Sequence, residues 1–519
     1  MNEGKYPIGI QSFRELRNRN CIYVDKTADI YRLANTNKYY FLSRPRRFGK
    51  SLLVSTLETY FSGDKGYFGG LAIEGLQPGD WPVHPVLHFD FSKGEYTRRG
   101  GLESVLDYML SSYEEVYGTR REARAPGERF AELIERAYAR TGRQAVVLID
   151  EYDLPIVNSI GDKALGEENR AILKGFYGVM KSMDAKLRFV LLTGVGKLGQ
   201  LSVFSGLNNI LDISLLPQYS TLCGISEEEL HRYFSDGIRE LADYNGWSEE
   251  EAYRRLKSRY DGYHFAEDLR DIYNPFSLLN CLATRKVAGF WFQTGTPSHL
   301  LTVLSEARTD LARLGHTVID ADALVAADVI QYKPVPFMFY TGYLTIKAYD
   351  GDFGEYTLGY PNTEVEQGFM KCLLPCITGT DDGEANNFVK NSVRMIRSGR
   401  IEEFLVSMKA FYAGIPYDMQ ARNEYFYQNV MYCVTTMLGF YVQAEYHTSG
   451  GRIDMVLGTD TTVYVMEFKL DKSAQTAMEQ IEDRGYALPF SLSGRRVVKV
   501  AADFSSRTRT LDSWIIREA

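Results

Sequence analysis

The sequence predicts an α/β protein with a parallel sheet, a mostly helical middle and a smaller α/β domain in its C-terminal part. Strands that are covered on both faces read as nearly continuous apolar runs, and three such runs occur in the N-terminal part: Tyr39–Leu42, Ala145–Ile149 and Leu187–Leu192, the last interrupted only by Arg188. Apolar residues recur at helical spacing from Ser226 onward, and strand patterns dominate again near the C-terminus. We therefore expect a parallel sheet, a helical lid with a linking region, and a second sheet domain.

Length and composition fit a globular protein with more than one core. A chain of 519 residues exceeds what one hydrophobic core can hold, and 45% hydrophobic with 24% charged residues is ordinary for globular domains. We predict domains over residues 1–224, 225–415 and 416–519. The formal net charge of −8 argues against a uniformly basic coat for nucleic acid, although a local basic groove is compatible with it.

Cysteine usage and hydropathy bear on the compartment. The six cysteines are scattered without the spacing of a zinc site, and so few in a long chain are typical of a reducing compartment. No apolar run approaches the roughly 18 residues of a membrane span, and the N-terminus lacks the apolar segment of a signal peptide. We expect a cytoplasmic protein with no membrane partner.

The first chemical motif lies between the run Tyr39–Leu42 and a helical pattern that begins near Lys50. The turn between them leads into Phe48-Gly49-Lys50-Ser51, and strand, turn and helix in this order are the layout of a phosphate-binding loop. Backbone N–H groups at the helix start face an anion, Lys50 adds charge for the phosphates, and the Ser51 hydroxyl can ligate Mg²⁺. The alternative is a Gly-Lys-Ser tripeptide that begins a helix by chance.

This loop departs from the usual pattern at position 44, where arginine stands in place of the expected glycine. Glycine allows a positive φ in the turn, so Arg44 either changes the turn or is tolerated in it. Pro45 fixes the local backbone, and Arg46 and Arg47 add positive charge that attracts phosphates. We count Arg46, Arg47 and Phe48 with the loop as nucleotide-binding candidates.

Two further predicted strands end in polar residues, at the edge where open parallel sheets place ligands. Ala145–Ile149 is followed by Asp150 and Glu151, and we expect Asp150 to hold Mg²⁺ and Glu151 to polarise the attacking water. Leu187–Leu192 is followed by Thr193, which is suited to sensing the γ-phosphate. The alternatives are an acidic pair that caps the next helix and a threonine that only ends a strand. Together with the loop, these residues predict a site for ATP.

The remaining segments of the first two parts frame this site. The N-terminal segment with Tyr23–Thr27 is expected to pack beside the nucleotide base, and Asp25 or Thr27 to cap the helix that follows. Ser226 and Glu229 form a capping box at the start of the predicted lid. Residues Phe337–Tyr349 and Tyr356–Leu358 favour a short β element within otherwise helical sequence.

A second motif lies near the C-terminus. After the Gly450-Gly451 turn, one predicted strand carries Asp454 and the next, Thr462–Leu470, carries Glu467 and Lys469. Alternate residues of a strand share a face, so Glu467 and Lys469 lie together while Phe468 turns to the opposite side. Asp454 can then share a Mg²⁺ with Glu467, and Mn²⁺ is compatible with the same oxygen ligands.

The chemistry of this motif is that of phosphodiester cleavage. The metal would lower the pKa of a bound water, and Lys469 would orient that water or stabilise charge on the phosphate. Supporting residues come from neighbouring elements: Glu424 from the preceding helix, Glu445 from the preceding strand and Gln480 from the following helix. A strand over Val497–Ala501 ends the predicted sheet. The alternative is a set of charges that pair across exposed strands for solubility alone.

Both motifs make the chain similar to a bacterial family that joins an AAA-ATPase-like domain to a C-terminal PD-(D/E)XK nuclease-superfamily domain. The resemblance covers nearly the whole chain and rests on these segments: Tyr23–Thr27, Arg44–Ser51, Ile149–Asp153, Phe204–Asn209, Tyr273–Pro275, Gly451–Asp454 and Glu467–Lys469. In that family arginine is the usual residue at the position of Arg44, so the missing glycine is a family trait.

The resemblance implies a fold and two sites. It implies a RecA/AAA-like P-loop sheet that binds nucleotide and Mg²⁺ through Lys50, Ser51 and Asp150. It also implies a restriction-endonuclease-like αβ domain, with the carboxylates of the second motif and its lysine as the nuclease site.

Three functions fit these motifs. The first is a Mg²⁺-dependent ATPase coupled to a nuclease that acts on DNA or RNA. The second is a nucleotide-regulated switch that binds nucleic acid or a partner through an inactive nuclease-like domain, and the third is an interaction module in which both sites are relict. The sequence leaves open the choice of DNA or RNA, the formation of a homo-oligomer and the source of any arginine finger.

Overall fold

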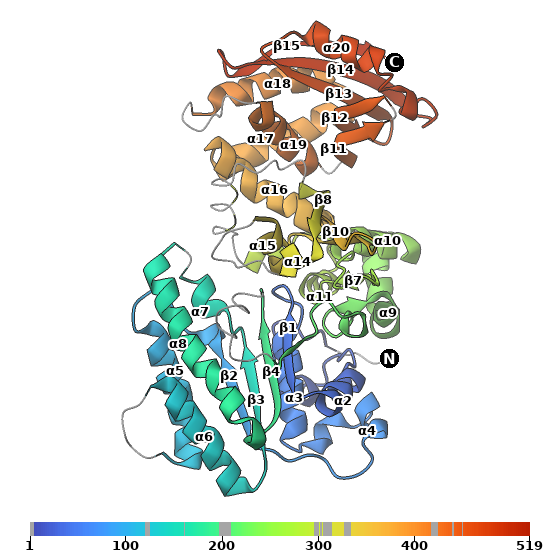
Figure 1. The fold of residues 1–519 in the computed structure, drawn as a ribbon. Helices are drawn as coiled ribbons and strands as arrows, with labels where there is room; N and C mark the ends of the chain where they lie inside the picture. Colours follow the sequence, from blue (N-terminus) through green and yellow to red (C-terminus); the bar gives the residue numbers. More distant parts are fainter. Residues whose placement is uncertain are drawn as a thin grey trace. The chain divides into compact units, whose positions relative to one another are not determined.

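The computed structural model describes residues 5–119, 125–159, 161–196, 209–294, 300, 304, 314–325, 334–416, 424–438, 441–448 and 450–519. The chain forms two compact units (Figure 1): Met1–Trp291 with Val318–Asn362, and Phe292–Thr317 with Thr363–Ala519. The predicted middle domain, residues 225–415, is thus divided between the two units, and its boundaries stay predictions. In the described part of the chain, no helix combines the length and apolar content needed to cross a bilayer.

A five-stranded parallel sheet organises the first unit, as the apolar runs predict. Its strand order is β2-β3-β4-β1-β5, and the strands are β1 (Tyr39–Ser43), β2 (Val86–Asp90), β3 (Ala145–Asp150), β4 (Leu187–Gly194) and β5 (Leu211–Asp212). All residues of β1 and β3 are buried, which explains why they read as continuous apolar sequence. The pairing of Ser43 with Gly194 and of Ile149 with Leu192 brings the ends of β1, β3 and β4 to one edge.

The helices of the first unit that precede the lid lie beside this sheet or on one another (Figure 1). They are α1 (Phe13–Asn18), α2 (Thr27–Thr36), α3 (Lys50–Phe61), α4 (Ala72–Leu76), α5 (Gly101–Tyr117), α6 (Pro126–Thr141), α7 (Leu154–Val157) and α8 (Lys163–Ser182). The start of α2 is fixed by Asp25, whose Oδ1 accepts a hydrogen bond from the backbone N–H of Thr27 at 2.9 Å. Apolar residues of α5, α6 and α8 form one buried cluster with the sheet.

The lid helices follow the sheet in the chain. They are α9 (Glu227–Asn245), α10 (Glu249–Tyr260) and α11 (Pro275–Thr284), with the short strand pair β6 (Ile225–Ser226) and β7 (Ile272–Tyr273). The predicted capping box is present, because Ser226 accepts from the N–H of Glu229 while the Glu229 side chain accepts from the N–H of Ser226.

A small second sheet follows the lid, and here one prediction is wrong. The sheet has the order β8-β10-β9, with β8 (Thr317–Asp320), β9 (Thr345–Asp350) and β10 (Glu355–Gly359), beside the helices α14 (Ala321–Val325) and α15 (Pro334–Thr341). The predicted β element over Phe337–Tyr349 is therefore helical as far as Thr341. Met338, Phe339 and Tyr340 are all buried, so no polar periodicity distinguishes the helix from a strand.

The second unit contains a five-stranded sheet of order β11-β12-β13-β14-β15, antiparallel except for the parallel pair β13 and β14. Its strands are β11 (Tyr441–Thr448), β12 (Gly451–Gly458), β13 (Thr462–Leu470), β14 (Arg496–Ser505) and β15 (Thr510–Glu518). The prediction that Val497–Ala501 ends the sheet is wrong, because β15 follows it. This edge strand is buried only at its first two residues and therefore lacks the apolar run of a central strand.

Helices lie on both faces of this second sheet, and some of them pack on other helices rather than on the strands (Figure 1). They are α16 (Thr363–Thr378), α17 (Asp382–Arg397), α18 (Ile401–Gly414), α19 (Glu424–Met437) and α20 (Ala474–Asp483). Ala477 and Ile481 of α20 pack in one cluster with Val465 of β13. On the opposite face the Tyr427 ring of α19 stacks on Phe504 at 4.8 Å. The predicted α/β fold class, with a parallel sheet and a C-terminal mixed sheet, is confirmed.

Candidate functional site

The loop between β1 and α3 has the predicted order of strand, turn and helix. Helix α3 begins at Lys50, directly after Gly49, which has a φ of +93°. Arg47 also lies in the left-handed region, with a φ of +70°, a conformation that costs a residue with a side chain about 1 kcal/mol or more. Since Arg44 is not among the described residues with positive φ, the left-handed turn of this loop lies at positions 47 and 49.

Arg44 anchors the loop to the chain that follows β5. Its guanidinium is buried and donates hydrogen bonds to the carbonyl oxygens of Ser43, Ser214 and Tyr219 at 2.8, 2.7 and 2.9 Å. It also lies over the Phe265 ring, 4.3 Å from the ring centre. Arg44 is therefore accommodated in the loop without a positive φ, and its charge is used inside the protein.

Lys50 is held close to the loop and to the end of β3. Its side chain is only 3% exposed, and its Nζ donates to the carbonyl oxygens of Arg44 at 3.0 Å and Pro45 at 3.3 Å. The same Nζ lies 3.3 Å from Oε1 of Glu151. The structure thus brings the predicted phosphate-binding lysine and the predicted water-polarising carboxylate together.

Asp150 is the point at which three elements meet. The Thr193 hydroxyl of β4 donates to Asp150 Oδ1 at 2.5 Å, and the Ser51 hydroxyl of α3 also hydrogen-bonds the carboxylate. Burial raises the pKa of Asp150, while the Ser51 and Thr193 hydrogen bonds and the Lys50 charge oppose the rise. A serine hydroxyl beside an aspartate at a strand end is a suitable pair of oxygen ligands for Mg²⁺.

The other nucleotide-binding candidates of the loop differ in how exposed their side chains are. Arg46 and Arg47 are exposed, and the Arg47 guanidinium lies 5.1 Å from the centre of the Phe276 ring. Phe48 is buried, with its ring against Tyr263 at 4.7 Å and Phe265 at 5.2 Å. The Phe48 side chain therefore joins the loop to the segment after α10.

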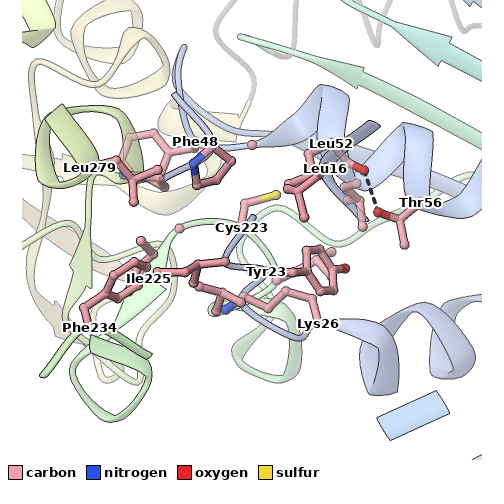
Figure 2. A pocket seen from close by; sticks show the side chains of 18 residues that line it. Leu16, Tyr23, Lys26, Phe48, Leu52, Thr56, Cys223, Ile225, Phe234 and Leu279 are labelled. Atoms are coloured by element: carbon pink, nitrogen blue, oxygen red, sulfur yellow. Dashed lines mark hydrogen bonds between the residues drawn. The ribbon is translucent and has the colours of Figure 1, made fainter. Parts of the chain in front are cut away.

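An apolar cavity beside the loop was missed by sequence reasoning. It encloses about 100 Å³ next to Gly49 and the first turn of α3, and Figure 2 shows Tyr23, Phe48 and Cys223 around it. Lys26 also lines it, but its Nζ is paired with Glu229 at 2.6 Å. The lining comes from segments far apart in the chain, so only the expectation that the Tyr23–Thr27 segment packs beside a base pointed to this place.

Asp153 is a further residue whose role the sequence did not indicate. Its buried carboxylate accepts hydrogen bonds from the backbone N–H groups of Val195 at 3.1 Å and Gly196 at 2.9 Å. Gly194, the last residue of β4, directly precedes them, and any side chain there would collide with Asp153 and Tyr152. Asp153 thus fixes the chain just after Thr193.

The second candidate site lies on β12 and β13. Lys469 Nζ pairs with Glu467 Oε1 at 2.8 Å, as expected for alternate residues on one face. Asp454 Oδ2 accepts from the Phe468 backbone N–H at 2.7 Å, and the N–H of Asp454 approaches Glu467 Oε2 at 3.5 Å. The Glu467 side chain is 2% exposed and that of Lys469 14%, so two carboxylates and an ammonium meet in a largely enclosed place.

Of the three residues predicted to support the second site, the structure describes the side chain of Gln480. Gln480 Nε2 donates to the Tyr486 hydroxyl at 3.4 Å, and this hydroxyl packs close to Gly451 at the turn before β12. Gln480 thus steadies the chain next to the site. Glu424 and Glu445 fall in α19 and β11, but their side chains lie outside the described residues.

Comparisons with known proteins match both ends of the chain. Residues 7–204 match the family described as "Predicted AAA-ATPase", and residues 422–514 match the "PD-(D/E)XK nuclease superfamily". A protein of Azotobacter chroococcum mcd 1, described as "Uncharacterized protein in vnfD 5'region", is 35% identical over 540 aligned positions, which cover 99% of each chain. The resemblance predicted from the two motifs is confirmed.

Proposed function

Because the chain belongs to the family that joins an AAA-ATPase-like domain to a C-terminal PD-(D/E)XK nuclease-superfamily domain, we propose that it is a Mg²⁺-dependent ATPase coupled to a metal-dependent nuclease. The nuclease acts on phosphodiester bonds of DNA or RNA. The observation that carries the proposal is the convergence of Ser51 and Thr193 on Asp150, beside the paired Lys50 and Glu151.

Each site residue of the first unit has its own role in phosphoryl transfer. Lys50 exchanges the loop carbonyls for the β- and γ-phosphates, while Ser51 and Asp150 hold Mg²⁺. Released from Lys50, Glu151 orients the attacking water, and Thr193 senses the γ-phosphate through its bond to Asp150. The cavity next to Gly49 receives the nucleotide base, since an apolar wall suits a flat ring and the loop is directly adjacent.

The residues of the second unit provide the groups for phosphodiester hydrolysis. Asp454 and Glu467 hold the divalent ion, Mg²⁺ or Mn²⁺, through carboxylate oxygens. When bound, such an ion supplies positive charge to the phosphate and lowers the pKa of a water ligand. Lys469 leaves Glu467 to hold the attacking water or the charged phosphate, and Gln480 keeps the adjacent turn in place.

Phosphate release from ATP tests the first site. We expect Lys50→Ala to lose ATP binding, whereas Glu151→Gln keeps binding and loses hydrolysis by about 100-fold or more, the usual contribution of a positioned base. Ser55→Ala, in the same helix but bonded to the N–H of Phe13, is the matched control and should hydrolyse at the wild-type rate. Equal rates for Glu151→Gln and wild type would contradict the assignment.

Cleavage of plasmid and single-stranded substrates tests the second site. We expect Mg²⁺-dependent cleavage by the wild type and its loss in Asp454→Asn and Lys469→Met. The exposed Glu479→Gln on α20 is the matched control. If the wild type cleaves no substrate while nucleotide still changes its binding to nucleic acid, the second unit is an inactive binding module. If Lys50→Ala keeps full nucleotide-stimulated cleavage, the proposed coupling is wrong.

A further inference from the structure

Three acidic side chains converge in the lid, outside both candidate sites. Glu227 is the first residue of α9, Asp261 follows α10, and Asp271 precedes β7. One carboxylate oxygen from each lies within 4.8 Å of the other two. Their sequence separation shows that the fold, rather than a local acidic run, brings them together.

Asp261 distinguishes this cluster from ordinary surface acids. Its side chain is 1% exposed, and the partners of its carboxylate among the described residues are the Lys257 ammonium, 3.3 Å from Oδ2, and the backbone N–H of Gly262. Burying a carboxylate is costly unless a positive charge or hydrogen bonds replace the lost water. The deepest oxygens of the cluster therefore have capacity for a cation.

A single ammonium stands at the centre of the cluster. Lys257 Nζ lies 2.8 Å from Glu227 Oε2, 3.0 Å from Asp271 Oδ2 and 3.3 Å from Asp261 Oδ2. His264 Nε2 faces the other oxygen of Asp271, Oδ1, at 2.8 Å, and the Tyr273 hydroxyl donates to Glu227 at 3.2 Å. The Lys257 side chain is 51% exposed, so its flexible stem can carry the ammonium out to water.

We propose that Glu227, Asp261 and Asp271 form a binding site for a hard divalent cation, which takes the position of the Lys257 ammonium. Carboxylate oxygens are the ligands that Ca²⁺, Mg²⁺ and Mn²⁺ prefer. A divalent ion matches three carboxylates better in charge than one ammonium does. Lys257 acts as a competing cation that sets how tightly the ion binds.

Residues 261–265 lead from this site to the phosphate-binding loop, because side chains of this segment pack on residues of the loop. In this segment Tyr263 and Phe265 pack on Phe48, and Phe265 also lies over Arg44. Gly262 has a φ of +84° and no room for a side chain against the carbonyl oxygen of Pro361. A cation bound by Asp261 therefore holds the segment that covers the loop, and we expect it to stabilise the first unit.

Mn²⁺ binding to the full chain tests this site. Asp150→Asn and Asp454→Asn are introduced together to remove ligands of the other two sites, and free Mn²⁺ is measured by electron paramagnetic resonance. We expect one Mn²⁺ per chain to remain bound. Asp261→Asn should weaken it by at least about tenfold, as the loss of groups around a metal commonly does. Glu228→Gln, the exposed neighbour of Glu227, is the matched control.

Lys257→Met gives an independent test that does not depend on removing a buried carboxylate. Without its competitor the ion should bind at least about tenfold more tightly, and Mn²⁺ should raise the thermal midpoint of this variant more than that of its parent. Failure of the doubly substituted chain to retain Mn²⁺, or no tightening in Lys257→Met, would show that Lys257 is a permanent counter-ion. Neither result bears on ATP hydrolysis or nuclease activity, so the site is tested separately from the proposed function.

Discussion

Glu151 has a left-handed backbone conformation, which glycine adopts more easily than a residue with a side chain. It has a φ of +54°, and a left-handed φ costs a residue with a side chain about 1 kcal/mol or more. Its carboxylate pairs with the buried Lys50 at the phosphate loop. A chemically demanding position thus coincides with local strain, as is typical of functional sites.

Glycine at this position should therefore stabilise the first unit relative to alanine. Both Glu151→Gly and Glu151→Ala lose the carboxylate and its ion pair with Lys50, but only glycine relieves the strain at positive φ. We expect the glycine variant to be about 1 kcal/mol more stable than the alanine variant, measured by thermal unfolding, with hydrolysis lost in both. At ordinary φ the order is reversed, so a more stable alanine variant would disprove the strain.

Asp153 should make the stability of the first unit depend on pH. Burial, together with the Glu151 charge, raises the pKa of Asp153 to about 7, against the hydrogen bond from Gly196 and the charge of Lys50. An unfolded chain releases this proton near pH 4. Between about pH 4 and pH 7 only the folded state keeps the proton, so stability falls as pH rises and falls no further above about pH 7.

Asp153→Asn removes this titration while keeping the size of the side chain. The thermal midpoint of the wild type, relative to that of Asp153→Asn, should fall from pH 5 to pH 7 and level off by pH 8. Parallel curves for the two proteins over this range would contradict a buried protonated carboxyl at position 153.

The role of Arg44 marks the limit of sequence reasoning at the level of residues. The motif shows that glycine is missing from the loop, but the carbonyl oxygens that bind the guanidinium belong to Ser43, Ser214 and Tyr219. Two of these acceptors are far along the chain, and carbonyl groups leave no trace in the side-chain sequence. The positions of Lys50, Asp150 and Thr193 in the fold could be predicted because each lies at an end of an element with a strong apolar pattern.

Elements were predictable where burial imposes a pattern on the chain. Strands β1, β3 and β4 are central, so both faces are apolar, and β13 was predicted with its exact bounds. The edge strand β15 lacks this constraint because much of it faces water. Helix α15 is so apolar that its period is hidden. In the turn before β12, a glycine stands where the backbone passes close to the end of α20.

Gly450 lies where the turn between β11 and β12 meets the end of α20. A Cβ at this position would collide with the carbonyl oxygen of Arg484. We expect Gly450→Ala to destabilise the second unit by about 1–3 kcal/mol, the usual cost of overpacking. Gly414→Ala, at the end of α18 with open space around it, is the matched control and should be neutral or slightly stabilising. Equal thermal midpoints for the two variants would show that the turn can move away from α20.

The whole molecule is divided into two units that alternate along the chain. The first unit is completed only by Val318–Asn362, and the second includes Phe292–Thr317. The returning stretch is structurally necessary: the Thr345 hydroxyl accepts from the His264 N–H at 2.7 Å, the Ile346 carbonyl lies 2.6 Å from His264 Nδ1, and the Tyr263 hydroxyl donates to Gly342 at 3.2 Å. Linear domain boundaries drawn from sequence could not reveal this exchange.

A fragment of residues 1–291 should therefore be less stable than one of residues 1–362. The shorter fragment lacks several hydrogen bonds to the 263–264 segment, each worth about 1 kcal/mol. We expect trypsin to digest it at least about tenfold faster, because cleavage follows the population of opened chains. Equal resistance of the two fragments would mean that β9 and β10 are dispensable for the first unit.

The alternation of the two units along the chain also constrains how the protein is made. The ribosome delivers residues in order, and N-terminal domains usually fold while the rest is still being translated. Here the nascent first unit stays incomplete until Asn362 has emerged, and by then Phe292–Thr317 has already left the exit tunnel without its partners. The nascent chain therefore contains one segment of the second unit, without the rest of that unit, at the time when the first unit is completed.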